Sequence, residues 1–204
     1  MFTVWRVGSK ASPPVQSTRF AGVAWLALVS LVLGVFAMGP GHASDFELLS
    51  VGVRARLGEK RVLGEVAPES FREYDVVAAI RLPWEEQFRA RWAVGARLLA
   101  SVGVLQGADK TALVASLIPV LAIATQDGRF TLDLGAGLAL LSRHRYAQQD
   151  YGGPLQFALT LGFSIPLYER VGVGYRFLHY SDASAYGSGT IGADFHMLEL
   201  IYRF

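Results

Sequence analysis

The sequence contains no cysteine among its 204 residues. This absence excludes a disulfide framework, a thiolate metal site, a cysteine nucleophile and an acylated N-terminal cysteine. Charged residues are also few, at 18% of the chain, whereas 52% of the residues are hydrophobic. Even so, the only long apolar run lies near the N-terminus. An apolar chain without further long runs is typical of a membrane β-barrel, in which every second side chain faces lipid.

Acidic residues are absent from the first 43 positions, which hold an apolar run over 20–38. Three cations precede this run, and the small residues Gly41 and Ala43 occupy positions −3 and −1 if cleavage follows Ala43. This order of regions predicts a secretory signal peptide over 1–43, with the mature chain beginning at Ser44. An uncleaved anchor helix remains the alternative, because about 19 apolar residues can span a bilayer.

Beyond residue 43, the 16 Lys and Arg residues nearly balance the 17 Asp and Glu residues. The mature chain is therefore close to neutral, and its charge gives no reason to expect a nucleic-acid partner. Its length predicts a single domain over 44–204.

Apolar and polar residues alternate through most of this domain, most clearly over 155–165. Strict alternation predicts strands with two unlike faces, and segments of about ten residues suit a membrane-spanning strand. Eight segments show the pattern: 47–57, 71–82, 88–104, 112–125, 129–141, 154–165, 170–182 and 194–204. An even number of such segments predicts an all-β fold, an eight-stranded antiparallel transmembrane β-barrel of the outer membrane.

The expected connections between the strands alternate in length. Short turns, which face the periplasm in such barrels, are predicted at 83–87, 126–128 and 166–169. Longer connections, predicted to face outside, are 58–70, 105–111, 142–153 and 183–193. Both termini are then periplasmic. The chain ends on Phe204 of an amphipathic strand, which resembles the signal read by the outer-membrane assembly machinery, an expected partner.

Two polar residues interrupt the lipid-facing series of the seventh strand. Its apolar positions end at Phe177, and the two-residue period places His179 and Ser181 on the same face. Polar side chains facing lipid are costly unless they are used or lie at the interface. Their Cβ atoms should lie ~6.6–6.8 Å apart, a gap that an imidazole and a hydroxyl can bridge. The pair is therefore a candidate base and nucleophile.

The last strand supplies an acid on the same face. Counting back from Phe204 in steps of two reaches Asp194 at the outer end of the neighbouring strand. A carboxylate behind the histidine would fix its tautomer and support the imidazolium. The alternative is that His179 and Ser181 form a polar pair at the headgroup boundary without a chemical role.

The segments GVGYRFLHYSDA over 172–183 and GADFHMLELIYRF over 192–204 resemble the C-terminus of the lipid A 3-O-deacylase (PagL) family. The resemblance covers about the last 35 residues. It implies an outer-membrane barrel that needs no metal or other cofactor and removes the ester-linked acyl chain at position 3 of lipid A. It further implies that Ser181 is the nucleophile, that His179 is the general base and that Asp194 replaces the family's usual glutamate.

Three features depart from the family pattern. The family commonly has asparagine directly after the serine, where this chain has Asp182. The stretch 186–190 lacks the asparagine that the family carries in this loop. The acid is a shorter aspartate, displaced by one residue. Backbone N–H groups near Asp182 and Ala183 are then the candidates for stabilising an oxyanion.

The leading hypothesis is a serine carboxylic-ester hydrolase that acts on lipid A of lipopolysaccharide in the outer leaflet. A non-catalytic small barrel used for adhesion or membrane integrity is one alternative. Another is an acyltransferase that modifies lipid A. The sequence leaves open whether the barrel forms a homodimer.

Overall fold

The computed structural model describes residues 46–58, 62–63, 70–88, 91–187 and 190–204. The predicted signal peptide, 1–43, lies outside the described residues. No helix in the described part of the chain is long and apolar enough to cross a membrane. The strands are β1 (Glu47–Gly58), β2 (Phe71–Phe88), β3 (Trp92–Gly107), β4 (Lys110–Thr125), β5 (Thr131–Leu141), β6 (Arg145–Tyr146), β7 (Gln149–Asp150), β8 (Leu155–Tyr168), β9 (Val171–Ser181) and β10 (Ala193–Arg203).

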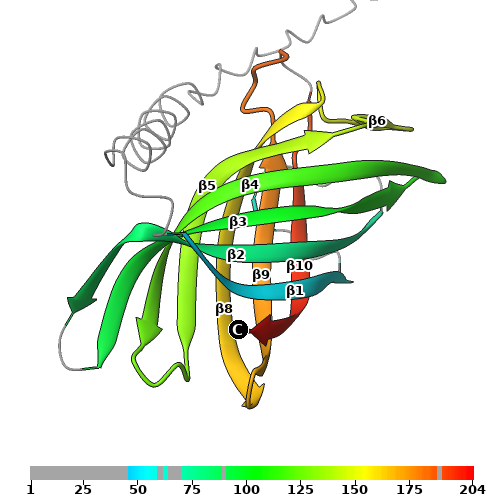
Figure 1. The fold of residues 1–204 in the computed structure, drawn as a ribbon. Coiled ribbons are helices and arrows are strands. Elements are labelled where there is room, and N and C mark those ends of the chain that lie inside the picture. Colours follow the sequence, from blue (N-terminus) through cyan, green and yellow to red (C-terminus); the bar gives the residue numbers. More distant parts are fainter. Residues whose placement is uncertain (1–45, 59–61, 64–69, 89–90, 188–189) are drawn as a thin grey trace, which may run out of the picture.

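Eight of these strands form a closed antiparallel barrel in the order β1-β10-β9-β8-β5-β4-β3-β2 (Figure 1). The first and last strands pair from Ser50 with Arg203 to Gly58 with His196, so the barrel has no free edge. Strands β6 and β7 pair only with each other, as a short hairpin. The predicted eight-stranded barrel is therefore confirmed.

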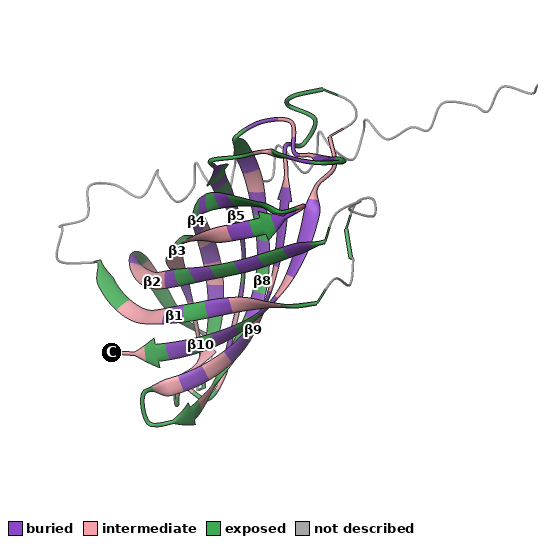
Figure 2. Ribbon diagram, turned by 90° about the vertical axis from the view of Figure 1, so that its right-hand side faces the viewer, coloured by how far each residue is buried: buried purple, intermediate pink, exposed green. Residues whose placement is uncertain are grey.

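Alternate residues along each strand face opposite sides of the wall, which Figure 2 shows as alternating colours. In β4, Leu113 and Leu117 are exposed, whereas Val114 and Ile118 are buried. Exposed large hydrophobic side chains recur in this way on seven of the eight barrel strands, whereas the outward apolar side chains of β9 are only partly exposed. An exterior of this kind matches the apolar band that a bilayer requires.

Ion pairs occupy the barrel interior. The Arg176 guanidinium lies 2.6 Å from a carboxylate oxygen of Asp133 and 3.3 Å from one of Glu199. On the neighbouring strand β1, Arg54 pairs in register with Glu199 and contacts Asp75 of β2 at 2.6 Å. All five side chains are nearly inaccessible to solvent, so each charge depends on its partner for stabilisation.

Two predicted connections are wrong. The turn expected at 83–87 belongs to β2, which continues to Phe88. Pro83 has no N–H to donate, and the pairing of β2 with β3 shifts register between Arg81 and Glu85, so the strand continues through an irregularity. The loop expected at 105–111 is a turn of only two residues, because Ala108 and Asp109 both adopt positive φ angles, 47° and 57°. Two such residues form the tight turn that suits a β-hairpin.

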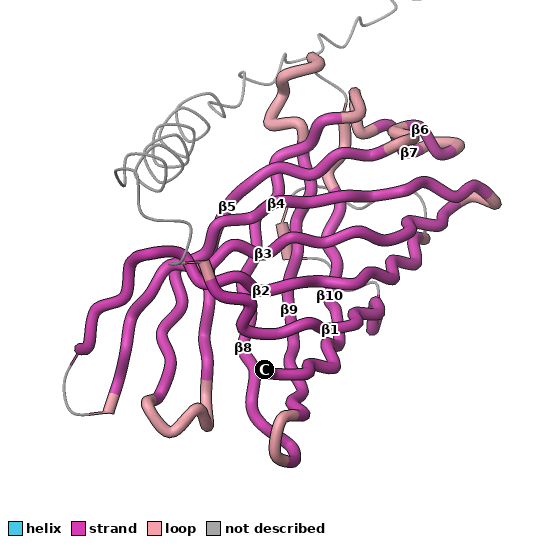
Figure 3. Tube along the Cα trace, viewed as in Figure 1, coloured by secondary structure: helices cyan, strands magenta, loops and turns pink. Residues whose placement is uncertain are grey.

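The barrel has two distinct ends. The end that carries the β1–β2, β3–β4, β5–β8 and β9–β10 connections is called the loop end, and the other, with the C-terminus, is called the turn end (Figure 1). In Figure 3 the described loop residues of these connections are pink, between the magenta strands. The two-residue β3–β4 turn lies at the loop end, so the expected alternation of short and long connections is wrong at this one position.

Candidate active site

His179 and Ser181 lie at the loop end of β9, of which Ser181 is the last residue. Tyr180, between them, is completely buried and donates a 2.9 Å hydrogen bond to Glu73 inside the barrel. Because neighbouring strand residues face opposite sides, His179 and Ser181 project from the outer face. Their shared face is the one that the alternation predicted.

His179 is hydrogen-bonded to the acid on the next strand. Asp194 of β10 pairs directly with His179 in the sheet, and its Oδ1 lies 2.6 Å from His179 Nδ1. An ionised carboxylate can only accept, so Nδ1 carries the proton in this pair. In a neutral imidazole the other nitrogen, Nε2, then holds the lone pair that a general base needs.

The second oxygen of Asp194 is bound by a distant part of the chain. Oδ2 accepts hydrogen bonds from the backbone N–H groups of Val62 and Leu63, both at 2.6 Å. These residues belong to the β1–β2 connection, about 130 positions earlier in the chain. Sequence reasoning missed them because a backbone N–H is common to all residues except proline and leaves no pattern in residue type.

Ser181 is partly exposed and lies close to His179. A Cβ atom added to Gly192 would be 3.1 Å from His179 Cε1 and 3.2 Å from the Ser181 Cβ, so both side chains border the same point in space. Within the described part of the chain, the structure contains no hydrogen bond between the Ser181 hydroxyl and His179. Nucleophile–base hydrogen bonds are often longer without substrate than during the reaction.

Asp182, directly after Ser181, organises the connection that follows. Its buried carboxylate accepts hydrogen bonds from the N–H groups of Ser184 (3.1 Å) and Tyr186 (3.2 Å) and from the hydroxyl of Thr190 (2.8 Å). Ala183 and Ser184 adopt positive φ angles of 49° and 67°. The residue that departs from the family's asparagine is thus the acceptor around which this loop folds.

The β6–β7 hairpin packs against the same loop. The Gln149 side-chain amide donates to the Ile191 carbonyl, and the Ile191 N–H donates to the Asp150 carbonyl at 3.0 Å. A Cβ atom added to Gly153 would collide with the Tyr186 ring, at 2.2 Å from its Cζ. The two longest connections that are largely described therefore support each other beside Ser181.

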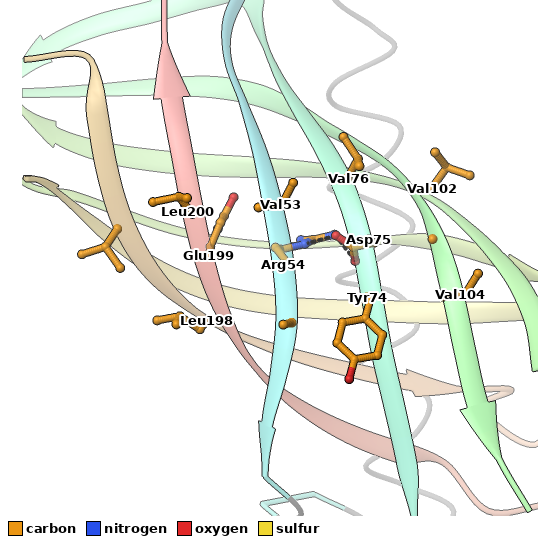
Figure 4. A pocket seen from close by; sticks show the side chains of 13 residues that line it. Val53, Arg54, Tyr74, Asp75, Val76, Val102, Val104, Leu198, Glu199 and Leu200 are labelled. Carbon is orange, nitrogen blue, oxygen red and sulfur yellow. Dashed lines mark hydrogen bonds and ion pairs between the residues drawn. The ribbon is translucent and has the colours of Figure 1, made fainter.

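A pocket of about 660 Å³ lies on another part of the wall (Figure 4). Apolar side chains such as Val53, Tyr74 and Leu198 line it, around the Arg54–Asp75 ion pair. None of the three candidate residues lines this pocket. Among the described residues, no group of three or more His, Asp or Glu side chains could hold a metal ion.

The family model described as "Lipid A 3-O-deacylase (PagL)" matches residues 72–203, more than half of the chain. Among solved structures, the chain is similar to the crystal structure of the outer membrane enzyme PagL, with a TM-score of 0.61 at 18% identity. That similarity covers 76% of this chain and 99% of the other.

A second solved structure, the Yersinia pestis outer membrane protein Ail, has a TM-score of 0.43 at 11% identity, covering 78% of this chain and 100% of that one. No curated protein matches the sequence. The family match includes β9 and β10, which carry His179, Ser181 and Asp194. The chain is an outer-membrane β-barrel and belongs to the lipid A 3-O-deacylase (PagL) family.

Proposed function

We propose that this chain is a serine esterase that hydrolyses the acyl ester at position 3 of lipid A, with Ser181, His179 and Asp194 as its catalytic residues. The observation that carries the proposal is the 2.6 Å bond between His179 and Asp194 on the outer face of the barrel, beside Ser181. A buried, oriented histidine next to a hydroxyl is the arrangement that activates a serine nucleophile. The family match supplies the substrate class.

In the proposed reaction, the Ser181 hydroxyl attacks the ester carbonyl while His179 Nε2 accepts its proton. The tetrahedral intermediate collapses, and His179 returns the proton to the departing sugar oxygen. Water, deprotonated by the same nitrogen, then attacks the acyl-enzyme and releases the fatty acid. Asp194 stabilises the imidazolium in both steps and keeps the proton on Nδ1.

The negative oxygen of the intermediate needs hydrogen-bond donors. The Asp182 carboxylate cannot donate, and three groups of its own loop already bind it. Backbone N–H groups of the tight turn at Asp182 and Ala183 are the donors closest in sequence to the nucleophile. A preorganised backbone donor of this kind is a common means of stabilising an oxyanion.

The membrane location of the site fits a lipid substrate. His179 and Ser181 lie on the face that carries the apolar exterior, at the loop end of the barrel. If the loop end faces outside, as barrels with periplasmic termini require, the site lies at the outer leaflet, where lipid A is found. The last strand, β10, which is followed by Phe204, would then be recognised by the outer-membrane assembly machinery during insertion.

The test is to express the full chain in a bacterium with unmodified lipid A and to weigh the extracted lipid A by mass spectrometry. The wild type should remove one hydroxyacyl chain, and Ser181→Ala should remove none. Ser164→Ala, which changes a strand serine near the turn end, is the matched control and should behave like the wild type. A gain of one chain would indicate an acyltransferase. Unchanged lipid A with a folded barrel would favour the non-catalytic alternative.

A further inference from the structure

The carboxylate of Asp194 is held at both of its oxygens. Oδ1 bonds to His179, and Oδ2 accepts the N–H groups of Val62 and Leu63. A carboxylate bound in this way cannot rotate about its Cβ–Cγ bond without breaking a hydrogen bond. Two of the three bonds come from the β1–β2 connection, which neither the resemblance nor the predicted triad includes.

These two N–H groups also favour the charged form of the acid. The Asp194 side chain is only 3% exposed, and burial of an unsatisfied carboxylate is costly. Hydrogen bonds donated to a carboxylate stabilise its ionised state. Only that state both accepts the His179 Nδ1–H and supports an imidazolium.

The side chains of the two donors have little part in the arrangement. Val62 is 61% exposed and Leu63 is 40% exposed, whereas their N–H groups both point at the same oxygen. Two consecutive N–H groups on one carboxylate oxygen form a small backbone anion site. The contribution of Val62 and Leu63 therefore comes from their backbone.

Arg56 links the β1–β2 connection to β10, the strand that carries Asp194. It lies near the end of β1, and its Nη1 donates to the carbonyl of Phe71, the first residue of β2. Its Nη2 donates to the backbone carbonyl of Asp194 at 3.3 Å, and its guanidinium lies 5.1 Å from the Phe195 ring centroid. One side chain thus links both ends of the β1–β2 connection to β10 at Asp194.

We propose that Val62 and Leu63, in the β1–β2 connection, are positioning residues for the catalytic acid, acting through their backbone N–H groups and braced by Arg56. The proposal rests on the proposed function of His179 and Asp194. These N–H groups differ from an ordinary loop anchor in one respect: they affect activity by holding the Asp194 carboxylate in place.

Proline substitution removes one N–H donor, and alanine at the same position retains it. Val62→Pro and Leu63→Pro should each lower kcat about tenfold or more, with KM changed less than twofold, because hydrogen bonds to a charged group are among the stronger ones. Val62→Ala and Leu63→Ala are the matched controls and should retain wild-type kcat. Purified lipid A in detergent micelles is the substrate, and heat-modifiable migration in gels checks folding.

A double-mutant cycle separates positioning from general loop damage. In an Asp194→Asn background, Leu63→Pro should lower the residual activity no further. An equal loss in both backgrounds would overturn the proposal, as would full activity of folded proline variants. If the proline variants do not fold, Arg56→Met replaces Leu63→Pro in the same cycle. Arg56→Lys, which keeps the positive charge, is then the control.

A measurement without turnover keeps this proposal separate from the proposed function. In Ser181→Ala protein, the Nδ1–H proton of His179 should give a resolved downfield NMR signal. We expect the signal to be lost when Val62→Pro and Leu63→Pro are combined and to persist when both residues are alanine. Its persistence in the proline protein would overturn the positioning role even if the wild type deacylates lipid A. Its loss would support that role even if the wild type does not.

Discussion

The Tyr180 hydroxyl donates a 2.9 Å hydrogen bond to Glu73 across the barrel interior, and both side chains are completely buried. This bond links β9 to β2 at the height of the site, directly between His179 and Ser181 in the sequence. Because Tyr180 is held inside the barrel by this bond, its neighbours His179 and Ser181 are held facing outward.

Tyr180→Phe should destabilise the barrel by about 1–3 kcal/mol, because it leaves a buried carboxyl group without its donor. Adding Glu73→Leu should recover part of this loss, since no buried polar partner then remains. Urea unfolding in detergent, followed by tryptophan fluorescence, measures both variants. Additive losses in the double variant would contradict the assigned pairing.

Arg176 is the centre of the second interior network. Arg176→Met should cost about 3–5 kcal/mol, because Asp133 and Glu199 would remain as buried, uncompensated charges. Arg145→Ala breaks an exposed ion pair with Asp150 and should change stability by less than about 1 kcal/mol. The same unfolding assay compares the two, and similar losses would argue against a dependence on burial.

Gly192 leaves the space between the candidate base and nucleophile. An added Cβ would lie 2.7 Å from the Tyr180 carbonyl oxygen and close to both His179 and Ser181. Gly192→Ala should therefore displace the pair and lower kcat at least about tenfold, while the barrel still folds. Gly58→Ala is the control, because nothing lies within 4 Å of its added Cβ. Wild-type kcat in the Gly192 variant would show that the pair tolerates the methyl group.

Asp182 is expected to act through the loop that it organises. Asp182→Ala removes the acceptor of three hydrogen bonds and should expose 183–190 to limited proteolysis, with a several-fold loss of activity. Ser142→Ala removes the acceptor of one hydrogen bond, from the Leu113 N–H, on another connection. It should leave both cleavage and activity unchanged. Resistance to protease in the Asp182 variant would show that other contacts hold the loop.

Local periodicity predicted much of the fold and part of the site. Alternation located eight strands, and the side chains of Arg176 and Glu199 face inward as the two-residue period requires. The bond between His179 and Asp194 lies where parity and strand order predicted a contact. Turn chemistry was harder to predict, because Ala108 and Asp109 lack the glycine or asparagine that usually marks a two-residue hairpin.

The sequence by itself determined which side of the wall each side chain faces, because that property repeats every two residues along one strand. It thereby grouped His179, Ser181 and Asp194 on one face. Only the tertiary structure brought Val62 and Leu63 to Asp194 and Glu73 to Tyr180, since barrel closure places β1 and β2 beside or across from β9 and β10. Contacts made by backbone groups or across the barrel interior depend on that closure, and no local pattern of residue types encodes them.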